Sequence, residues 1–382
     1  HRLEARLLRH GDGVLAAGPQ GFARLTAMRR EGRGAPFSAP LEEALAILKL
    51  PQAELVHDGV ALVGNLKRLE DYPAAAVAAR KPEKQLKILY IGVHTNEIWR
   101  SEFSISKAFK DLGHEIIEYD YKSNRKKFKT WHQIGEELSY LEKNTKPDII
   151  FLQRGRKMSP IAFNLLESPI IYWSTEPIKL KKDADKLLYS NKFEWVFVHS
   201  YSCLDRIKSE FPHLVKKCSV MHNACPKDII NYDTEKSFWA IFNRNLSSRR
   251  KKWLQPSEKY INIIQGRFGN EYFDDLRKAH ISVNIHYSDK NIDDFETGIF
   301  EAMASGCAII SEQLNPQTLI DLEMEDAIIQ IDSPQGLKEE LEKLRSNPDI
   351  VKKYIGKSKS VVQKNTWHDR TNLFLAKFKE CI

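Results

Sequence analysis

Residues 291–311 read NIDDFETGIFEAMASGCAIIS and divide into an acidic loop, a short helix and a buried strand. Thr297 is placed to begin the helix, Glu301 falls about one turn into it, and Gly306 is placed to end it before the apolar run. The helix N-terminus presents free N–H groups and a positive dipole end, so an anion such as a diphosphate can bind there. The plainer alternative is a solvated acidic loop that caps a surface helix.

Outward from this segment, short apolar runs alternate with amphipathic stretches from Leu86 to the end of the sequence. Such alternation is typical of a parallel sheet that helices cover on both faces, and here it occurs twice. We therefore predict an α/β fold with two Rossmann-like domains and a cleft between them. The predicted strands are 86–93, 115–119, 148–152, 169–173 and 194–199, then 238–242, 260–265, 281–286 and 307–311; the clearest helices are 101–112, 335–345, 349–363 and 369–379.

The composition changes near residue 80, which marks a boundary. Residues 1–80 contain nine Arg, two Lys and one Ile, whereas the remainder is rich in Lys and Ile. We predict an N-terminal appendage over 1–85 that is mostly helical or irregular, a first Rossmann-like domain over 86–222 and a second over 223–365. Residues 366–382 are predicted to form a C-terminal helix.

Net charge, cysteine content and the absence of long apolar runs indicate the kind of partner, the lack of disulfides and the compartment to expect. The formal net charge of +8 and pI near 9.0 favour acidic partners: nucleic acid, an anionic membrane or a phosphate-bearing substrate. The five cysteines form no close CxxC pair, which indicates neither a disulfide framework nor a zinc site. Without a long apolar run or a signal-like N-terminus, we expect a cytoplasmic protein.

Basic residues follow the predicted strand 238–242. Arg244 comes just after it, and Arg249 and Arg250 lie in the basic run 249–252. Arginine forks match phosphate oxygens, so these side chains are candidates for stabilising a departing diphosphate. For the run 249–252 taken alone, a solvated basic turn is the alternative.

Three further candidates lie at the predicted carboxyl ends of strands, where ligands of open α/β sheets bind. Gly266 and Arg267 follow the run 260–265, and a plain turn is an equal alternative for them. His199 ends the run 194–199 and is a candidate catalytic residue on the acceptor side, although a hydrogen-bonded structural histidine is the commoner case.

The acidic loop and the EAMASG helix resemble those of GT-B glycosyltransferases of the group 1 superfamily, and most of all its CgeB-like, spore-maturation-protein-like branch. The resemblance implies that Glu301 binds the donor ribose and that Asp293, in place of the usual Glu, contacts the donor sugar. The glycine of that loop falls on Glu296, so Glu296 competes for the sugar-contacting role. Thr297 and Gly298 then open the helix that faces the nucleotide.

Other segments extend this resemblance over roughly residues 86–382. The segment 243–250 resembles the Gly-Arg-Leu loop with a basic residue five or six positions later, with Asn243 in place of glycine. It implies that Arg244 and either Arg249 or Arg250 bind the diphosphate, while Gly266 and Arg267 lie near the base. The ending 366–370 implies a last helix that crosses back onto the first domain.

The resemblance implies transfer of a sugar from a nucleoside diphosphate sugar to a saccharide, lipid-linked or protein acceptor, in cell-surface polysaccharide or glycoconjugate synthesis. It implies no cofactor and no bound metal. The DxD of Asp183 and Asp185 lies in a polar helical stretch and is rejected as a metal site. The basic and aromatic segment 125–131 is more typical of solvated surface, with a peripheral contact at the inner membrane face as its alternative.

Three rival functions stay open at this stage. One is a sugar-nucleotide epimerase of the same fold, and another is a catalytically silent protein that binds nucleotide sugars. Nucleic-acid binding is disfavoured, because the cations are dispersed and no binding motif is present.

Overall fold

The computed structural model describes residues 7–10, 13–16, 84–175, 178, 186–287 and 295–381. The chain divides into two compact units, His1–Ala76 and Val77–Ile382. In the first unit, β1 (Leu7–His10) and β2 (Gly13–Ala16) pair as an antiparallel hairpin. This hairpin lies within the predicted N-terminal appendage, and its strands of four residues are too short for a period-2 pattern to be distinguished in the sequence. Apart from residues 84 and 85, the rest of the predicted appendage lies outside the described residues.

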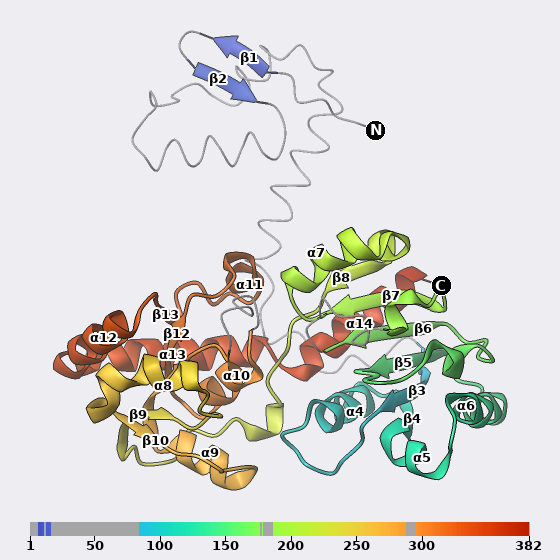
Figure 1. Cartoon of the computed structure of the whole chain (residues 1–382), viewed down its shortest axis with the longest axis horizontal. Helices are drawn as coiled ribbons and strands as arrows, with labels where there is room; N and C mark the ends of the chain where they lie inside the picture. Colours follow the sequence, from blue (N-terminus) through green and yellow to red (C-terminus); the bar gives the residue numbers. More distant parts are fainter. Residues whose placement is uncertain are drawn as a thin grey trace. The chain divides into compact units, whose positions relative to one another are not determined.

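The second unit contains two parallel sheets with helices, which confirms the predicted α/β fold (Figure 1). The first sheet has the order β4-β3-β5-β6-β7-β8, and its central strands are apolar and buried on both faces. Its strands are β3 (Lys87–Gly92), β4 (Glu115–Asp120), β5 (Ile149–Gln153), β6 (Ile170–Ser174), β7 (Phe193–Val198) and β8 (Cys218–Val220).

Helices cover both faces of the first sheet. On one face, α4 (Ser101–Asp111) and the C-terminal α14 (Trp367–Cys381) close a core that includes Phe109, Phe151 and Phe374. The other face packs against α6 (Trp131–Thr145), α7 (Tyr201–Glu210) and Tyr121, the first residue of α5 (Tyr121–Lys127). Because α14 packs here, the chain returns to the first sheet after completing the second.

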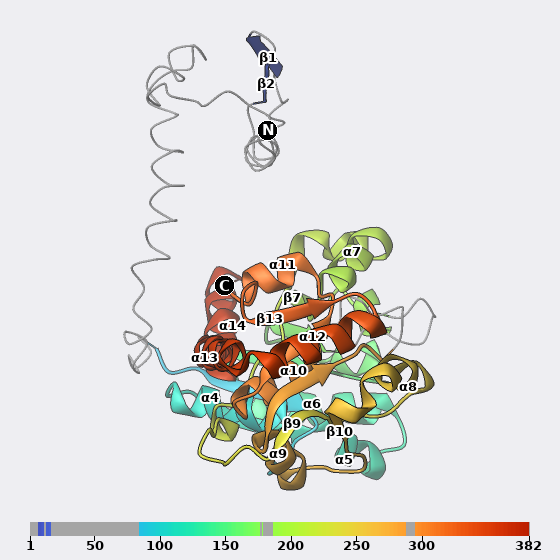
Figure 2. The same ribbon diagram turned by 90° about the vertical axis from the view of Figure 1, so that its left-hand side faces the viewer.

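The second sheet has the order β10-β9-β11-β12-β13, again all parallel. Helices lie on both of its faces (Figure 2). Its strands are β9 (Phe238–Phe242), β10 (Ile261–Ile263), β11 (Ala279–Asn284), β12 (Ala308–Glu312) and β13 (Ile328–Ile331). Its helices are α8 (Ser248–Leu254) and α12 (Pro334–Ser346) against one face, and α9 (Asn270–Arg277), α10 (Thr297–Ala304) and α11 (Pro316–Asp321) against the other. Helix α13 (Pro348–Lys364) contributes to both cores, with Val351 in the first and Val361 and Val362 in the second.

Short 3₁₀ turns complete the unit. They are η1 (Pro160–Phe163), η2 (Lys186–Tyr189), η3 (Pro212–Lys217), η4 (Lys227–Ile229) and η5 (Gln255–Tyr260). No helix of the described residues is long and apolar enough to cross a lipid bilayer.

The helix of the 291–311 segment begins and ends as its sequence predicts. Thr297 is the first residue of α10, and Gly306 follows the helix with φ of 77°, a left-handed conformation that glycine adopts without a Cβ penalty. The buried strand β12 follows directly. Helix α10 therefore starts at the carboxyl edge of the second sheet, where it can face a ligand.

The two crossings between the sheets lie against each other. Cys225 N–H donates to the carbonyl of Asn365 at 2.8 Å, and Trp367 N–H donates to the carbonyl of Cys225 at 3.1 Å. The buried guanidinium of Arg370 donates to the Asn365 side chain at 2.7 Å and to the carbonyl of His222 at 3.1 Å. The linker and the start of α14 are therefore tied together by backbone and side-chain hydrogen bonds.

Candidate active site

A cavity of about 420 Å³ lies between the carboxyl ends of the two sheets. This volume falls in the range of small-molecule sites. Both halves of the second unit contribute to its wall, as expected when two such sheets face each other. The lining residues are Ser101, Arg154, Trp173, Thr175, His199 and Asn223 from the first half and the linker, and Arg244, Tyr272, Phe295, Glu296, Thr297, Gly298 and Glu301 from the second.

The structure brings six of the sequence-predicted residues to this cavity and leaves four elsewhere. The six are His199, Arg244, Glu296, Thr297, Gly298 and Glu301. The four that do not line the cavity are Arg249, Arg250, Gly266 and Arg267. Asp293, the residue predicted to contact the donor sugar, lies outside the described residues, as do Asp183 and Asp185.

Arg244 packs directly against the first turn of α10. A Cβ on Gly298 would lie 2.5 Å from Arg244 Nη1 and 2.6 Å from Cζ, which is closer than atoms approach without a displacement. The absent side chain of Gly298 therefore makes the space in which the guanidinium sits. This contact holds a cation beside the N-terminus of the helix, so two features that attract anions lie together.

Glu296 accepts hydrogen bonds from two arginines. Arg244 Nη1 donates to it at 2.7 Å, and Arg250 Nη2 donates at 2.9 and 3.1 Å to its two oxygens. Both guanidiniums are largely buried, with 9% and 4% of their side chains exposed, whereas 25% of the Glu296 side chain is exposed. The carboxylate thus occupies the position between two forks that an anionic ligand would also favour.

Glu301 lies one turn further along α10 and accepts a hydrogen bond of 2.9 Å from the hydroxyl of Tyr272 on α9. Burial raises the pKa of Glu301, and the Tyr272 hydrogen bond and the Arg244 charge offset only part of that rise. Burial and then the nearby Glu301 carboxylate raise the pKa of Tyr272 well above its usual value, so its hydroxyl stays protonated and donates. The carboxylate keeps acceptor capacity that a ligand hydroxyl group can use.

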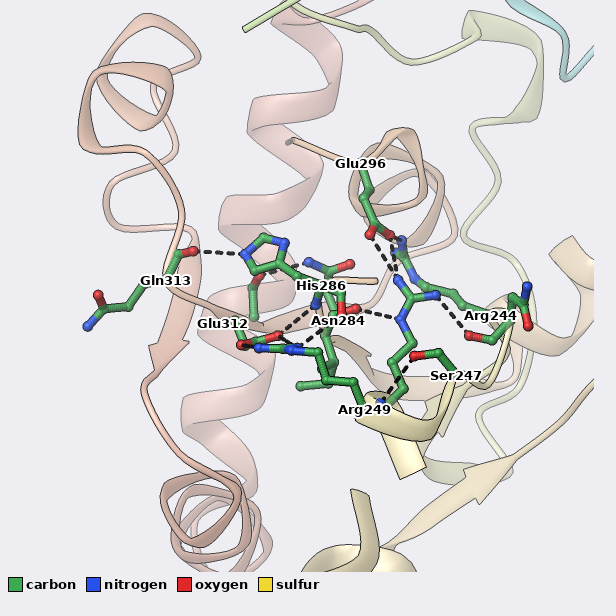
Figure 3. A network of polar contacts seen from close by, with 12 residues as sticks. Arg244, Ser247, Arg249, Asn284, His286, Glu296, Glu312 and Gln313 are labelled. Carbon is green, nitrogen blue, oxygen red and sulfur yellow. Dashed lines mark hydrogen bonds and ion pairs between the residues drawn. The ribbon is translucent and has the colours of Figure 1, made fainter. Parts of the chain in front are cut away.

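Arg249 does not line the cavity, and its guanidinium contacts Glu312 and His286 (Figure 3). Its guanidinium forms a bidentate pair with Glu312 at 2.6 and 2.7 Å and donates to the carbonyl of His286 at 3.0 Å. The same Glu312 accepts from the backbone N–H of His286 at 2.6 Å. Arg249 therefore ties α8 to the ends of β11 and β12. The position of Arg249 in the sequence predicts a phosphate contact. Sequence spacing alone does not show that the Glu312 carboxylate lies beside it.

Arg250 supports the wall of the cavity from behind. Besides Glu296, it donates to the carbonyls of Ile285 at 2.8 Å and Asn245 at 2.9 Å. Burial lowers its pKa, and the Glu296 carboxylate offsets part of that effect. Because four of its contacts are already within the protein, Arg250 positions Glu296 and does not itself face the cavity.

The loop after β10 lies beside the Arg244 loop but not on the cavity wall. The Gln265 side chain joins the two loops, since it donates to the carbonyl of Arg244 at 2.6 Å and accepts from Leu246 N–H at 3.0 Å. Gly266 has φ of 75° and open space around it, whereas Arg267 pairs with Glu271 on α9 at 3.0 Å. The backbone at Gly266 is thus accessible, and the Arg267 side chain turns to its own helix.

The first half supplies residues that the sequence reasoning missed. Ser101 begins α4 and Arg154 follows β5, and both line the cavity together with Thr175 and His199. Arg154 follows a predicted strand by two positions, so the rule that ligands bind at carboxyl ends of strands would have found it. Tyr272 was missed because α9 was not predicted.

His199 reaches the cavity from the end of β7 and is buried. Its Nδ1 lies 3.8 Å from Sγ of Cys203 on α7. Burial raises the pKa of the Cys203 thiol, but the contact with His199 and the Ser200 hydroxyl outweigh it, so the net pKa lies below the usual value. His199 therefore has a structural partner as well as access to the cavity.

Among residues 84–175, 178, 186–287 and 295–381, no group of three or more His, Cys, Asp or Glu side chains could hold a metal ion. The five cysteines are free thiols.

Solved structures of other proteins share this fold, although their sequences are only distantly similar. No family profile matches the sequence, and no curated protein matches it. Among solved structures, a glycosyltransferase from Rickettsia africae is 12% identical, with a TM-score of 0.53 over 78% of this chain and 99% of that one. HepE from Anabaena is 10% identical in its complex with UDP and glucose, with a TM-score of 0.53, and its UDP-glucose complex gives 0.52; both cover 78% of this chain and 100% of HepE. At these identities the likeness establishes the GT-B fold.

Proposed function

We propose that this chain is a glycosyltransferase that takes a sugar from a nucleoside diphosphate sugar and transfers it to an acceptor. The observation that carries the proposal is the convergence of Arg244, the N-terminus of α10 and Glu301 on one cavity. Arg244 follows β9, whereas the helix N-terminus and Glu301 both belong to α10. Arg244 and the helix N-terminus suit the diphosphate of the donor, and Glu301 suits its ribose. The GT-B fold, and the UDP and UDP-glucose bound to HepE, support this choice of ligand.

Each donor group has a partner of matching chemistry. Arg244 and the first amides of α10 would bind the diphosphate and stabilise the charge that develops on it as the glycosidic bond breaks. Glu301, held by Tyr272, would accept hydrogen bonds from ribose hydroxyls. The accessible backbone at Gly266 is our candidate for the base, and the loop containing Asp293 is our candidate for the sugar.

Glu296 takes a different role in this proposal from the one that its position in the sequence suggests. In the structure its carboxylate pairs with Arg244, the residue assigned to the diphosphate. A bound diphosphate would compete with Glu296 for that guanidinium. We therefore propose that the carboxylate holds Arg244 in place before the donor binds and gives way when the donor arrives.

The finer assignments are also part of the proposal. We place the chain in the group 1 superfamily near the CgeB-like branch, acting in the cytoplasm without a bound metal. In the segment 125–131, for which a membrane contact is the alternative interpretation, the guanidinium of Arg125 lies 5.2 Å from the Trp131 ring centre and donates to the carbonyl of Phe128. This favours the solvated-surface interpretation of that segment.

Thermal unfolding of the chain with a panel of nucleoside diphosphates tests the donor assignment. At least one diphosphate should raise the Tm of the parent but not that of Arg244→Ala or Glu301→Ala. Lys352→Ala is the matched control, since Lys352 lies exposed on α13 and pairs with Asp349. A diphosphate that stabilises all four proteins equally would disprove the proposed site.

Product analysis then separates transfer from its rivals. The matching nucleotide sugar is incubated alone and with an acceptor panel, and its products are separated by chromatography. Transfer predicts a glycosylated acceptor and free diphosphate. A changed sugar configuration without any acceptor would identify an epimerase, and binding without any product would identify a silent binding protein.

A further inference from the structure

We propose that Arg154 binds an anionic group of the acceptor, so that the acceptor is an acidic molecule bearing a phosphate or a carboxylate. This inference rests on the proposed function and assigns the first-half wall of the same cavity. Arg154 follows β5 and lines the cavity, whose opposite wall carries Arg244, Glu296 and Glu301. The Arg154 guanidinium thus lies on the first-half wall of the cavity, as the Arg244 guanidinium, assigned to the donor, lies on the second-half wall.

The backbone presents Arg154 in an uncommon conformation. Its φ is 70°, and Gly155 N–H donates to the carbonyl of Gln153 at 2.9 Å, which closes a tight γ-turn around Arg154. Non-glycine residues seldom adopt this left-handed conformation, and such positions gather at binding and catalytic sites. An ordinary surface arginine would not need this turn.

The surroundings hold the turn in place. Arg154 N–H donates to the carbonyl of Trp173 at 3.0 Å, and the Tyr172 hydroxyl donates to the carbonyl of Arg154 at 3.1 Å. Gly155, with φ of 58°, packs so closely that a Cβ would lie 2.5 Å from Leu187. The backbone of the turn that carries Arg154 is therefore held by neighbours on β6 and η2.

A buried polar network lies beneath the guanidinium. Glu102 Oε1 is 3.5 Å from Arg154 Nη2, and only 2% of the Glu102 side chain is exposed. Ser101 Oγ donates to Glu102 at 3.1 Å and accepts from Gln153 Nε2 at 2.9 Å, and the Tyr90 hydroxyl donates to Gln153. This chain of hydrogen bonds orients one edge of the guanidinium, while 29% of the Arg154 side chain is exposed.

The chemistry of the wall selects an anion. Arginine presents a planar fork that matches phosphate and carboxylate, and a neutral sugar gains less from it. Within the described residues, the cavity-lining Thr175 also has a buried Oγ1 without a hydrogen-bond partner, so a second polar contact is available to the ligand. Arg156 in the same loop is exposed and does not line the cavity, so it serves as a matched control for Arg154.

Calorimetric titration with matched sugars tests the inference on the full chain, with and without saturating UDP. The probes are glucose, glucose 6-phosphate and glucuronate. The parent should bind at least one of the two anionic sugars about 10-fold or more tightly than glucose, the gain that charged hydrogen bonds supply. Arg154→Gln should lose this preference, Arg154→Lys should keep part of it, and Arg156→Gln should keep it nearly whole.

Each other outcome has a defined meaning. Equal affinity for all three sugars, or no binding of either anionic sugar, overturns the inference. An equal loss in Arg154→Gln and Arg156→Gln also overturns it, because general electrostatics would then explain the preference. If the preference persists while no nucleoside diphosphate binds, the donor assignment fails and the anion site stands. Should Arg154→Gln not fold, Arg154→Lys carries the comparison.

Discussion

The Arg244 guanidinium fills the space that a side chain on Gly298 would occupy, so that a Cβ there would lie 2.5 Å from Nη1. The contact joins the end of β9 to the first turn of α10. It also explains a glycine in a helix, where this residue is otherwise unfavourable. Position 298 therefore has to lack a side chain for the Arg244 guanidinium to occupy this space.

Gly298→Ala should separate binding from folding. Alanine raises helix propensity by at most about 1 kcal/mol. Displacing Arg244 weakens its buried pair with Glu296 and offsets that gain, so the Tm should change little or fall slightly. The methyl group displaces the guanidinium, and nucleoside diphosphate affinity should fall by about 10-fold or more, the loss of a charged hydrogen bond. Gly356→Ala in α13 is the control, because its Cβ meets nothing within 4 Å. Equal affinities of the two variants would contradict the proposed role of the contact.

Glu296→Gln should bind nucleoside diphosphate several-fold more tightly than the parent, because no carboxylate then competes for Arg244. The variant should also be less stable by about 1–3 kcal/mol, since two largely buried guanidiniums lose their anionic partner. Calorimetry measures the first effect and urea unfolding the second. If diphosphate affinity stays unchanged while turnover falls, Glu296 instead positions the sugar.

Donor affinity should depend on the protonation of Glu301. Burial raises the pKa of this carboxyl, so it protonates at a higher pH than an ordinary glutamate and then accepts fewer hydrogen bonds. Diphosphate affinity should fall as the pH is lowered through that raised pKa. Tyr272→Phe removes a hydrogen bond that lowers the pKa, so the loss should begin at a higher pH. Binding that shows the same pH profile in Glu301→Gln would assign the titration to another group.

The raised pKa of Glu301 also makes the free energy of unfolding depend on pH. Because the folded-state pKa of Glu301 lies above its unfolded value, the folded protein binds the proton more tightly. This residue therefore lowers the free energy of unfolding as the pH rises from the ordinary glutamate value through the folded-state pKa. Urea unfolding across this interval should show a shallower loss in Glu301→Gln.

Arg249→Lys should affect stability and leave binding unchanged. The variant keeps the charge but loses the bidentate geometry toward Glu312 and the bond to the His286 carbonyl. A destabilisation of about 1–3 kcal/mol is expected for the loss of charged hydrogen bonds. Nucleoside diphosphate affinity should match the parent's. A large loss of affinity at unchanged stability would return Arg249 to the donor site.

The sequence predicted most of the fold because strands of a parallel sheet are buried on both faces and read as apolar runs. Helix α10 was predictable from its ends, at Thr297 and Gly306. The two strands of the parallel sheets that were not predicted, β8 and β13, lie at sheet edges. One is three residues long and the other four, so neither offers a pattern long enough to recognise.

The site was predictable where position along a strand decides function. Arg244 and His199 follow strands, and the same rule applied to Arg154 would have revealed it. Pairing between distant segments was not predictable: Glu312 lies 63 residues from Arg249 and Tyr272 lies 29 from Glu301. Such partners decide whether an arginine binds a ligand or forms an ion pair within the protein. They can be identified only from the three-dimensional arrangement of the helices and strands.

The late position of helix α14 in the chain affects how the first sheet folds during synthesis. Trp367 packs 5.3 Å from Trp173, and Phe374 packs 4.6 Å from Phe151, between ring centres, so α14 completes a core that strands of the first sheet begin. A ribosome makes those strands some 200 residues earlier. Helix α4 covers part of this apolar face early, but the part beneath α14 stays uncovered until residues 367–381 emerge, which makes it a natural place for a chaperone to act during synthesis.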